Sequence, residues 1–203
     1  IFYAQEAYQL PEVLYFWQWQ LARLLNELNQ KDEAIEAYKE AIKTLTPIKK
    51  EFFKGYRNFK DSFKESVKPV YIGLVELIIE KAEKSKDEKY LREAIEIMET
   101  LKNMELENIF SDECLLKYKS KIKSLTSPPK DTVILYPIAL PNRVVKLIVF
   151  NDKITLHSFD INFIEFDTIV REFRQKLQTR VTKRFFYGRS EERRVGKDDS
   201  RWR

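Results

Sequence analysis

The sequence predicts a mainly α protein with a small β part: an array of antiparallel helices, then a three-stranded antiparallel meander and a further helix. Through about residue 125, apolar residues recur every three or four positions, as on the buried face of a helix. Glycine occurs only 4 times in 203 residues, and a sequence poor in glycine favours helices. After Pro128 and Pro129 the pattern changes to short runs rich in β-branched and aromatic residues, which are typical of strands.

Two helices open the array and are expected to form an antiparallel hairpin around a polar turn at residues 29–32. The apolar face of the first consists of Leu14, Trp17, Leu21, Leu24, Leu25 and Leu28. The face of the second consists of Ala34, Ile35, Tyr38, Ala41, Ile42 and Leu45. Pro47 is expected to close the second helix, because proline cannot donate the next backbone hydrogen bond.

Four more helices are expected before the prolines. Their faces are Phe52, Tyr56, Phe59 and Phe63; then Val70, Leu74, Leu77 and Ile78; then Leu91, Ala94, Ile95, Met98 and Leu101; then Leu115, Tyr118, Ile122 and Leu125. Pro69 suits the start of the second of these, since its missing N–H has no partner in a first helical turn. A polar turn at 85–89 precedes the third.

The β part begins after a linker, because helix cannot pass through Thr126 to Pro129. Strands are expected at 132–140, 144–150 and 154–159, with turns at 141–142 and 151–152. A last helix is expected at about 162–179, with Asn162 as its N-cap. Its apolar face consists of Phe166, Ile169, Val170, Phe173 and Leu177.

The composition limits which cellular locations and binding partners are expected. No apolar run reaches the roughly 18 residues that span a bilayer, so we expect no membrane insertion. A single cysteine, Cys114, cannot form an intramolecular disulfide and fits a reducing, cytoplasmic location. The net charge of +5 is too small to indicate nucleic acid by itself. Because the sequence begins at Ile1 rather than at methionine, we expect a truncated piece of a larger protein.

The first hairpin, roughly Leu14 to Pro47, follows a tetratricopeptide-like pattern. That pattern needs small residues where two helices cross closely and a large residue between them. Ala22, Ala34, Tyr38 and Ala41 lie at matching offsets, and Pro47 lies one position late. The pair from Pro69 to Leu101 is longer and fits less well. The alternative is an ordinary helical bundle with alanines at its crossings.

Several segments resemble CHAT domains, which are caspase- and separase-like modules found beside tetratricopeptide repeats. The resemblance is carried by Ala94–Lys102, Glu105–Phe110, Asp112–Cys114 and Thr132–Pro141, and by the strands and helix that follow, and it covers about residues 14–187. It implies a tetratricopeptide-like array at 1–127, a linker at 128–131 and the N-terminal portion of a caspase-like α/β domain at 132–187. Peptidase-active members use a His–Cys dyad downstream of this opening, so no family catalytic residue is carried over.

The C-terminal segment 188–203 has a different character. Arg189 to Lys197 resembles the translation of a sequencing-library adapter, and the segment has no apolar periodicity. We therefore expect a disordered tail foreign to the fold. The alternative is a basic interaction tail.

The sequence contains few residues that could form a catalytic or metal-binding site. A cysteine nucleophile needs a nearby base, and the only pair here is Cys114 and His157, whose order is opposite to that of caspases. His157 alternates with Leu156 on a predicted strand and is expected to be an exposed or hydrogen-bonded strand residue. Zinc needs three or four close ligands. We expect no catalytic, cofactor-binding or metal-binding residue, and no enzymatic activity of this fragment; activity of the full-length protein stays open.

The predicted function is protein–protein interaction, with a protein or peptide held in a groove of the helical array. In the intact protein, the resemblance implies a scaffold for a caspase-like cysteine peptidase. The alternative is a nucleic-acid-binding helical module, because lysines and arginines interleave with Phe52, Phe53, Tyr56, Phe59 and Phe63. The helical spacing of these aromatics favours core packing over base stacking.

Overall fold

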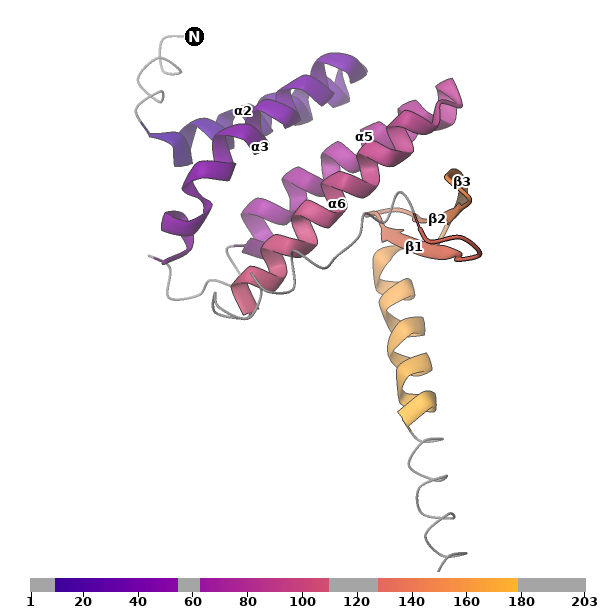
Figure 1. The fold of residues 1–203 in the computed structure, drawn as a ribbon. Coiled ribbons are helices and arrows are strands. Elements are labelled where there is room, and N and C mark those ends of the chain that lie inside the picture. Colours follow the sequence, from indigo (N-terminus) through magenta and orange to yellow (C-terminus); the bar gives the residue numbers. More distant parts are fainter. Residues whose placement is uncertain (1–9, 55–62, 110–127, 179–203) are drawn as a thin grey trace, which may run out of the picture. The chain divides into compact units, whose positions relative to one another are not determined.

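The computed structural model describes residues 10–54, 63–109 and 128–178. Helices α2 (Pro11–Glu27), α3 (Lys31–Lys54), α5 (Lys68–Ser85) and α6 (Glu88–Ile109) precede strands β1 (Ile134–Ala139), β2 (Val144–Phe150) and β3 (Lys153–Phe159), and a helix at 163–178 follows (Figure 1). A π-helical turn, η2 (Phe63–Val67), leads into α5. The predicted fold class, mainly helical with a small antiparallel sheet and a following helix, is confirmed.

Helices α2 and α3 form the predicted hairpin. Asn29 adopts a left-handed conformation in the connecting turn (φ 59°), which asparagine tolerates better than most residues. Ala22, Ala34 and Ala41 are all fully buried. Side chains this small allow neighbouring helix backbones to approach closely.

The predicted end of the second helix is wrong, because α3 continues through Pro47 to Lys54. A proline inside a helix removes one backbone hydrogen bond and crowds the preceding turn. The carbonyl of Ile42 accepts a hydrogen bond from the Thr46 hydroxyl, with 2.7 Å between the oxygens, and Leu45 is fully buried. Tertiary packing of the preceding turn thus outweighs the local effect of the proline.

Helix α5 lies between two other helices and is buried on both sides. It contacts α3 and α6, and its predicted inward residues, together with those predicted for α6, are buried. Pro69 lies in its first turn, as expected. Gly73 faces Tyr38 of α3 so closely that an added Cβ would lie 2.6 Å from the tyrosine hydroxyl oxygen and 2.7 Å from Cζ.

Ion pairs reinforce this arrangement at its margins. Lys31 of α3 lies 3.3 Å from Glu80 of α5, and Lys39 lies 2.9 Å from Glu93 of α6. The hydrogen bond from Lys39 to Glu93 raises the pKa of that lysine. All four side chains are partly exposed, so each pair contributes only about 0–1 kcal/mol. They orient helices whose association depends on the buried apolar residues.

The sheet has the order β1-β2-β3. Asn151 and Asp152 form the β2–β3 turn, both with positive φ (48° and 60°), as a type I′ hairpin turn requires. Tyr136 of β1 donates a hydrogen bond to the Glu99 carboxylate on α6, and the Lys102 ammonium lies 3.8 Å from the centre of its ring. Arg92 of α6 donates to the carbonyl of Asp152. These contacts join α6 to this part of the sheet.

The described residues divide between two compact units. The four helices belong to one unit with Tyr136 and Lys146–His157, and the other holds Pro137–Val145 and the residues from Ser158 onward. In the second unit, Asn162 is the predicted N-cap: its side-chain oxygen accepts a hydrogen bond of 3.0 Å from the Glu165 N–H. The predicted apolar face of this last helix is not a buried face, because Ile169, Val170, Phe173 and Leu177 are 45–63% exposed.

Several predictions lie outside the described residues. They are the middle of the third helix (Tyr56 and Phe59), the sixth helix with its four apolar residues, the first half of the linker, Cys114, and the tail at 188–203. Phe63, the last residue of the predicted third helix, is buried at the start of η2.

The contact between Gly73 and Tyr38 yields a prediction about packing. Alanine favours a helix over glycine by about 1 kcal/mol, but Gly73→Ala forces its methyl group against a buried ring, and such overpacking costs about 1–3 kcal/mol. We expect a net loss of roughly 1 kcal/mol in the free energy of unfolding, measured by urea denaturation. Tyr38→Leu in the same chain should reverse the sign of the Gly73→Ala effect; an unchanged effect in the double-mutant cycle would contradict the contact.

The buried tyrosines yield a prediction about pH. Burial, and next the hydrogen bond to Glu99, raise the pKa of Tyr136 above its usual 10.0, and burial raises that of Tyr38 and Tyr71. Below pH 10 both folded and unfolded chains keep these protons. Above it, only the unfolded chain loses them readily, so the free energy of unfolding should fall by up to about 1.4 kcal/mol per pH unit for each tyrosine.

Tyr136→Phe should make this decline less steep, and it should cost about 1–2 kcal/mol at neutral pH, because Glu99 loses a donor. Urea denaturation at pH 8 and pH 10.5 measures both effects. Glu99→Gln is the control: it keeps an acceptor for Tyr136, so most of the decline should remain. An equal decline in the wild type and in Tyr136→Phe would show that this hydroxyl is not protected by the fold.

Candidate interaction surface

Helix α2 carries a row of exposed apolar side chains, and this corrects the predicted core face of the first helix. Of the six residues predicted to be buried, Trp17, Leu21, Leu24 and Leu28 are 51–70% exposed. The buried side of α2 instead consists of Tyr15 and Ala22, at 2% and 0% exposure. The small side chain of Ala22 allows close contact with α3, and a leucine row at that interface would hold the two backbones apart.

We name the exposed row the α2 stripe. It consists of Leu10, Val13, Trp17, Leu21, Leu24 and Leu28, which are 38–70% exposed. At 3.6 residues per turn, all six directions fall within an arc of about 80°. The stripe extends from the residue before Pro11 to the residue after Glu27 and thus covers the whole length of the helix.

Aromatic residues flank the stripe on one side. The Phe16 ring lies edge-on to Trp17 and to Trp19, with ring centres 6.4 and 5.8 Å apart. The Arg23 guanidinium lies 5.7 Å from the centre of the Trp19 ring and donates a hydrogen bond of 3.1 Å to Gln20. Edge-to-face contacts of this kind hold aromatic rings in defined orientations. The rim of the stripe is therefore preorganised.

The charge of α2 also differs from that of its neighbour. Three of its 17 residues are charged, whereas 11 of the 24 residues of α3 are charged. Large aromatic and apolar side chains with few charges are the composition of the centre of a protein interface. An exposed apolar surface of this extent is more often a binding site than a surface without a function.

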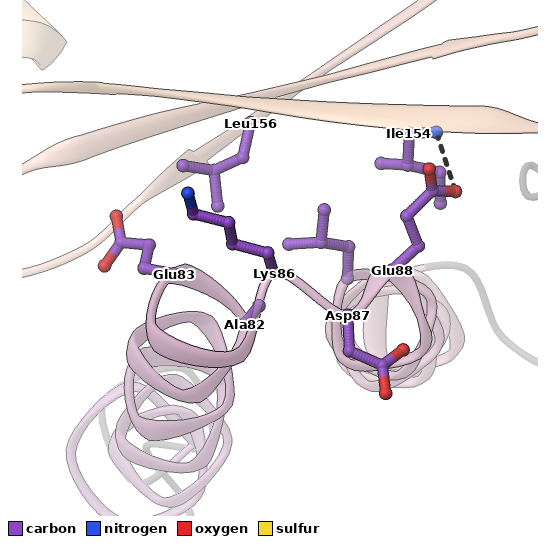
Figure 2. Close-up of a pocket in the computed structure, with 8 residues that line it drawn as sticks. Ala82, Glu83, Lys86, Asp87, Glu88, Ile154 and Leu156 are labelled. Atoms are coloured by element: carbon purple, nitrogen blue, oxygen red, sulfur yellow. Dashed lines mark hydrogen bonds between the residues drawn. The ribbon is translucent and has the colours of Figure 1, made fainter.

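A second feature is a pocket of about 340 Å³ next to the α5–α6 turn. Its apolar walls are formed by Ala82, Leu91, Ile154 and Leu156, and its charged residues are Glu83, Lys86, Asp87 and Glu88. Figure 2 shows the Lys86 side chain extending beneath β3 toward Leu156. The Glu88 carboxylate accepts a hydrogen bond of 3.3 Å from the backbone N–H of Ile154 (Figure 2), so this acid joins α6 to β3.

The pocket lies between packed elements and is lined by both apolar and charged residues. Asp87 is paired with Lys89 at 2.9 Å, a contact that raises the pKa of the lysine and lowers that of the acid. None of the residues that line the pocket is a serine, cysteine or histidine. A nucleophile paired with a histidine base is therefore not part of its wall.

The only cysteine and histidine of the sequence are not brought together in the part of the chain that the structure describes. His157 is exposed on β3, as its alternation with Leu156 predicted, whereas Cys114 lies outside the described residues. Among the residues that the structure describes, no three histidine, cysteine, aspartate or glutamate side chains are grouped so that they could hold a metal ion. In the same part of the chain, no helix has the length and apolarity to cross a membrane. Of the segment that interleaves lysines and aromatics, the side chains from 49 to 62 are not described.

The chain matches no model of a known protein family, no curated protein and no solved structure.

The α5–α6 turn yields a prediction about backbone strain. Lys86 ends α5 in a left-handed conformation (φ 54°), with its N–H bonded to the Ala82 carbonyl. Only glycine adopts this conformation without steric cost. Lys86→Gly should therefore raise the free energy of unfolding by about 0.5–1 kcal/mol in thermal or urea denaturation.

Lys84→Gly is the matched control, because Lys84 lies in the last turn of the same helix. It should lower stability by about 1 kcal/mol, as glycine does within helices. Destabilisation by Lys86→Gly of the same size would show that the side chain of Lys86 contributes more to the fold than its backbone costs.

Proposed function

We propose that this chain is a protein-interaction module whose binding surface is the α2 stripe. The observation that carries the proposal is that six large apolar side chains in a row remain exposed along one face of α2. They contribute little to the core, since the buried residues of α2 are Tyr15 and Ala22.

The partner that fits such a surface is an amphipathic helix. A straight row of apolar residues along a helix packs best against a second helix with apolar residues at i, i+3, i+4 and i+7. The array itself illustrates this arrangement: α5 has apolar residues on two sides, and both α3 and α6 pack against it. Helix α2 has apolar residues on two sides, and among the described elements α3 is its main neighbour.

The proposed place of this module is beside a caspase-like domain, as the resemblance to CHAT proteins implies. Support comes from the order of the described elements, in which paired helices precede three antiparallel strands and a helix. In such a protein, a partner bound at α2 would recruit or position the peptidase. This chain is then the interaction part, and we propose no catalysis for it.

A designed peptide tests the proposed surface. An 18-residue helical peptide with leucines at i, i+3, i+4 and i+7 and with glutamine and serine elsewhere should bind the chain in isothermal titration calorimetry. Leu21→Ser combined with Leu24→Ser should weaken binding at least about tenfold, because two central apolar contacts are lost. At concentrations where the chain is monomeric, the same variant should change the free energy of unfolding by less than about 0.5 kcal/mol, because both side chains are exposed.

Leu135→Ser is the control, because Leu135 is an equally exposed leucine on β1 (62%). It should leave binding of the peptide unchanged. Equal binding by the Leu21→Ser/Leu24→Ser variant, or no binding by a wild type that is monomeric at the concentration used, would contradict the α2 stripe as the interaction surface.

A further inference from the structure

We infer that the α2 stripe is occupied by the same stripe of a second copy of this chain, in an antiparallel helix pair about a twofold axis. This inference rests on the proposed function, because it names the partner of the same surface. Three features of the described residues support it: the order of the apolar residues along the stripe, its extent, and its charge.

The residues of the stripe are spaced almost symmetrically about the level of residue 19. Three precede that level and three follow it. In an antiparallel pair centred there, Leu10 lies opposite the second copy's Leu28, and Trp17 lies opposite its Leu21. Val13 and Leu24 match to within one residue, which is about 1.5 Å along a helix. A surface that complements itself in this way fits the symmetric interface of a twofold dimer.

The extent of the stripe suits a dimer. Aromatic side chains have roughly 150–250 Å² of surface each, and leucine and valine have less. The six side chains of the stripe, at 38–70% exposure, therefore offer at most about 800 Å². The largest apolar patch of a typical monomer is about 300–600 Å². A standard protein–protein interface buries about 800 Å² on each side. The stripe and its aromatic rim thus provide an area close to that of a stable dimer.

Charge does not oppose this pairing. A stripe that carried charges of one sign would repel the same stripe of its twofold-related copy. All six residues of the α2 stripe are uncharged, and the whole helix has two acidic residues and one basic residue.

Sedimentation velocity and equilibrium on the purified chain, from about 1 to 200 µM, test the inference. We expect a reversible dimer. Leu21→Glu and Trp17→Lys should each raise the dimer dissociation constant at least about 30-fold, as expected when a central interface residue is lost. Leu135→Glu should leave the dimer unchanged, and circular dichroism should show that every variant is folded.

Mixing the two charged variants tests the geometry of the pair. In the antiparallel pair, the ammonium introduced by Trp17→Lys in one chain lies opposite the carboxylate introduced by Leu21→Glu in the other. The unsubstituted Leu21 of the first chain still meets the unsubstituted Trp17 of the second. An equimolar mixture of the two variants should therefore form a heterodimer where neither variant dimerises alone. Absence of the heterodimer would overturn the twofold arrangement.

The remaining outcomes separate this inference from the proposed function. If the wild type is monomeric at 200 µM and still binds the designed peptide, the second copy is excluded as the occupant and the interaction surface stands. If it is monomeric and binds no peptide, both fail. Assembly into open oligomers that Leu21→Glu does not disrupt would place the self-association elsewhere on the chain and overturn the inference.

Discussion

The close approach of helix backbones is the constraint on which the helical array depends. Ala22 of α2 and Ala34 and Ala41 of α3 are fully buried, and Gly73 lets α5 come within contact of the Tyr38 ring. Tyr38 is the large buried residue of the α2–α3 pair. Its ring is also the surface against which α5 of the next pair packs. Small residues at these crossings fix the distances between helices, and the larger apolar residues of α5 and α6 then fill the remaining space.

The same constraint decides which side of α2 is buried. Helix α2 has two apolar sides, and only one can face α3. Close packing selects the side with Ala22, because the side with Trp17, Leu21 and Leu24 is too bulky for the short distance between the backbones. The exposed stripe therefore follows from the geometry of the core: the largest apolar residues of the helix are excluded from the crossing.

This explains what could and what could not be predicted from the sequence. Periodicity alone located α5 and α6 and their buried faces correctly, because each of these helices has its large apolar residues at the sites of packing. It failed for α2, where the most hydrophobic row is not the buried one; Ala22, already recognised as a residue of a helix crossing, was the signal that could have identified the core side. The prediction that the helix ends at Pro47 was also wrong. The free-energy cost of a proline inside the helix is smaller than the free energy gained by burying the turn before it.

The distribution of roles among the residues of α2 bears directly on function. Residues that hold a fold together are constrained by their buried neighbours, whereas exposed residues are free to be polar at little cost in stability. A row of exposed leucines and a tryptophan gives the isolated chain little stability and lowers its solubility. Such a row is favourable only if a second apolar surface covers it. The physical case for an interaction module thus depends on the difference between what α2 buries and what it exposes, and not on the helical fold itself.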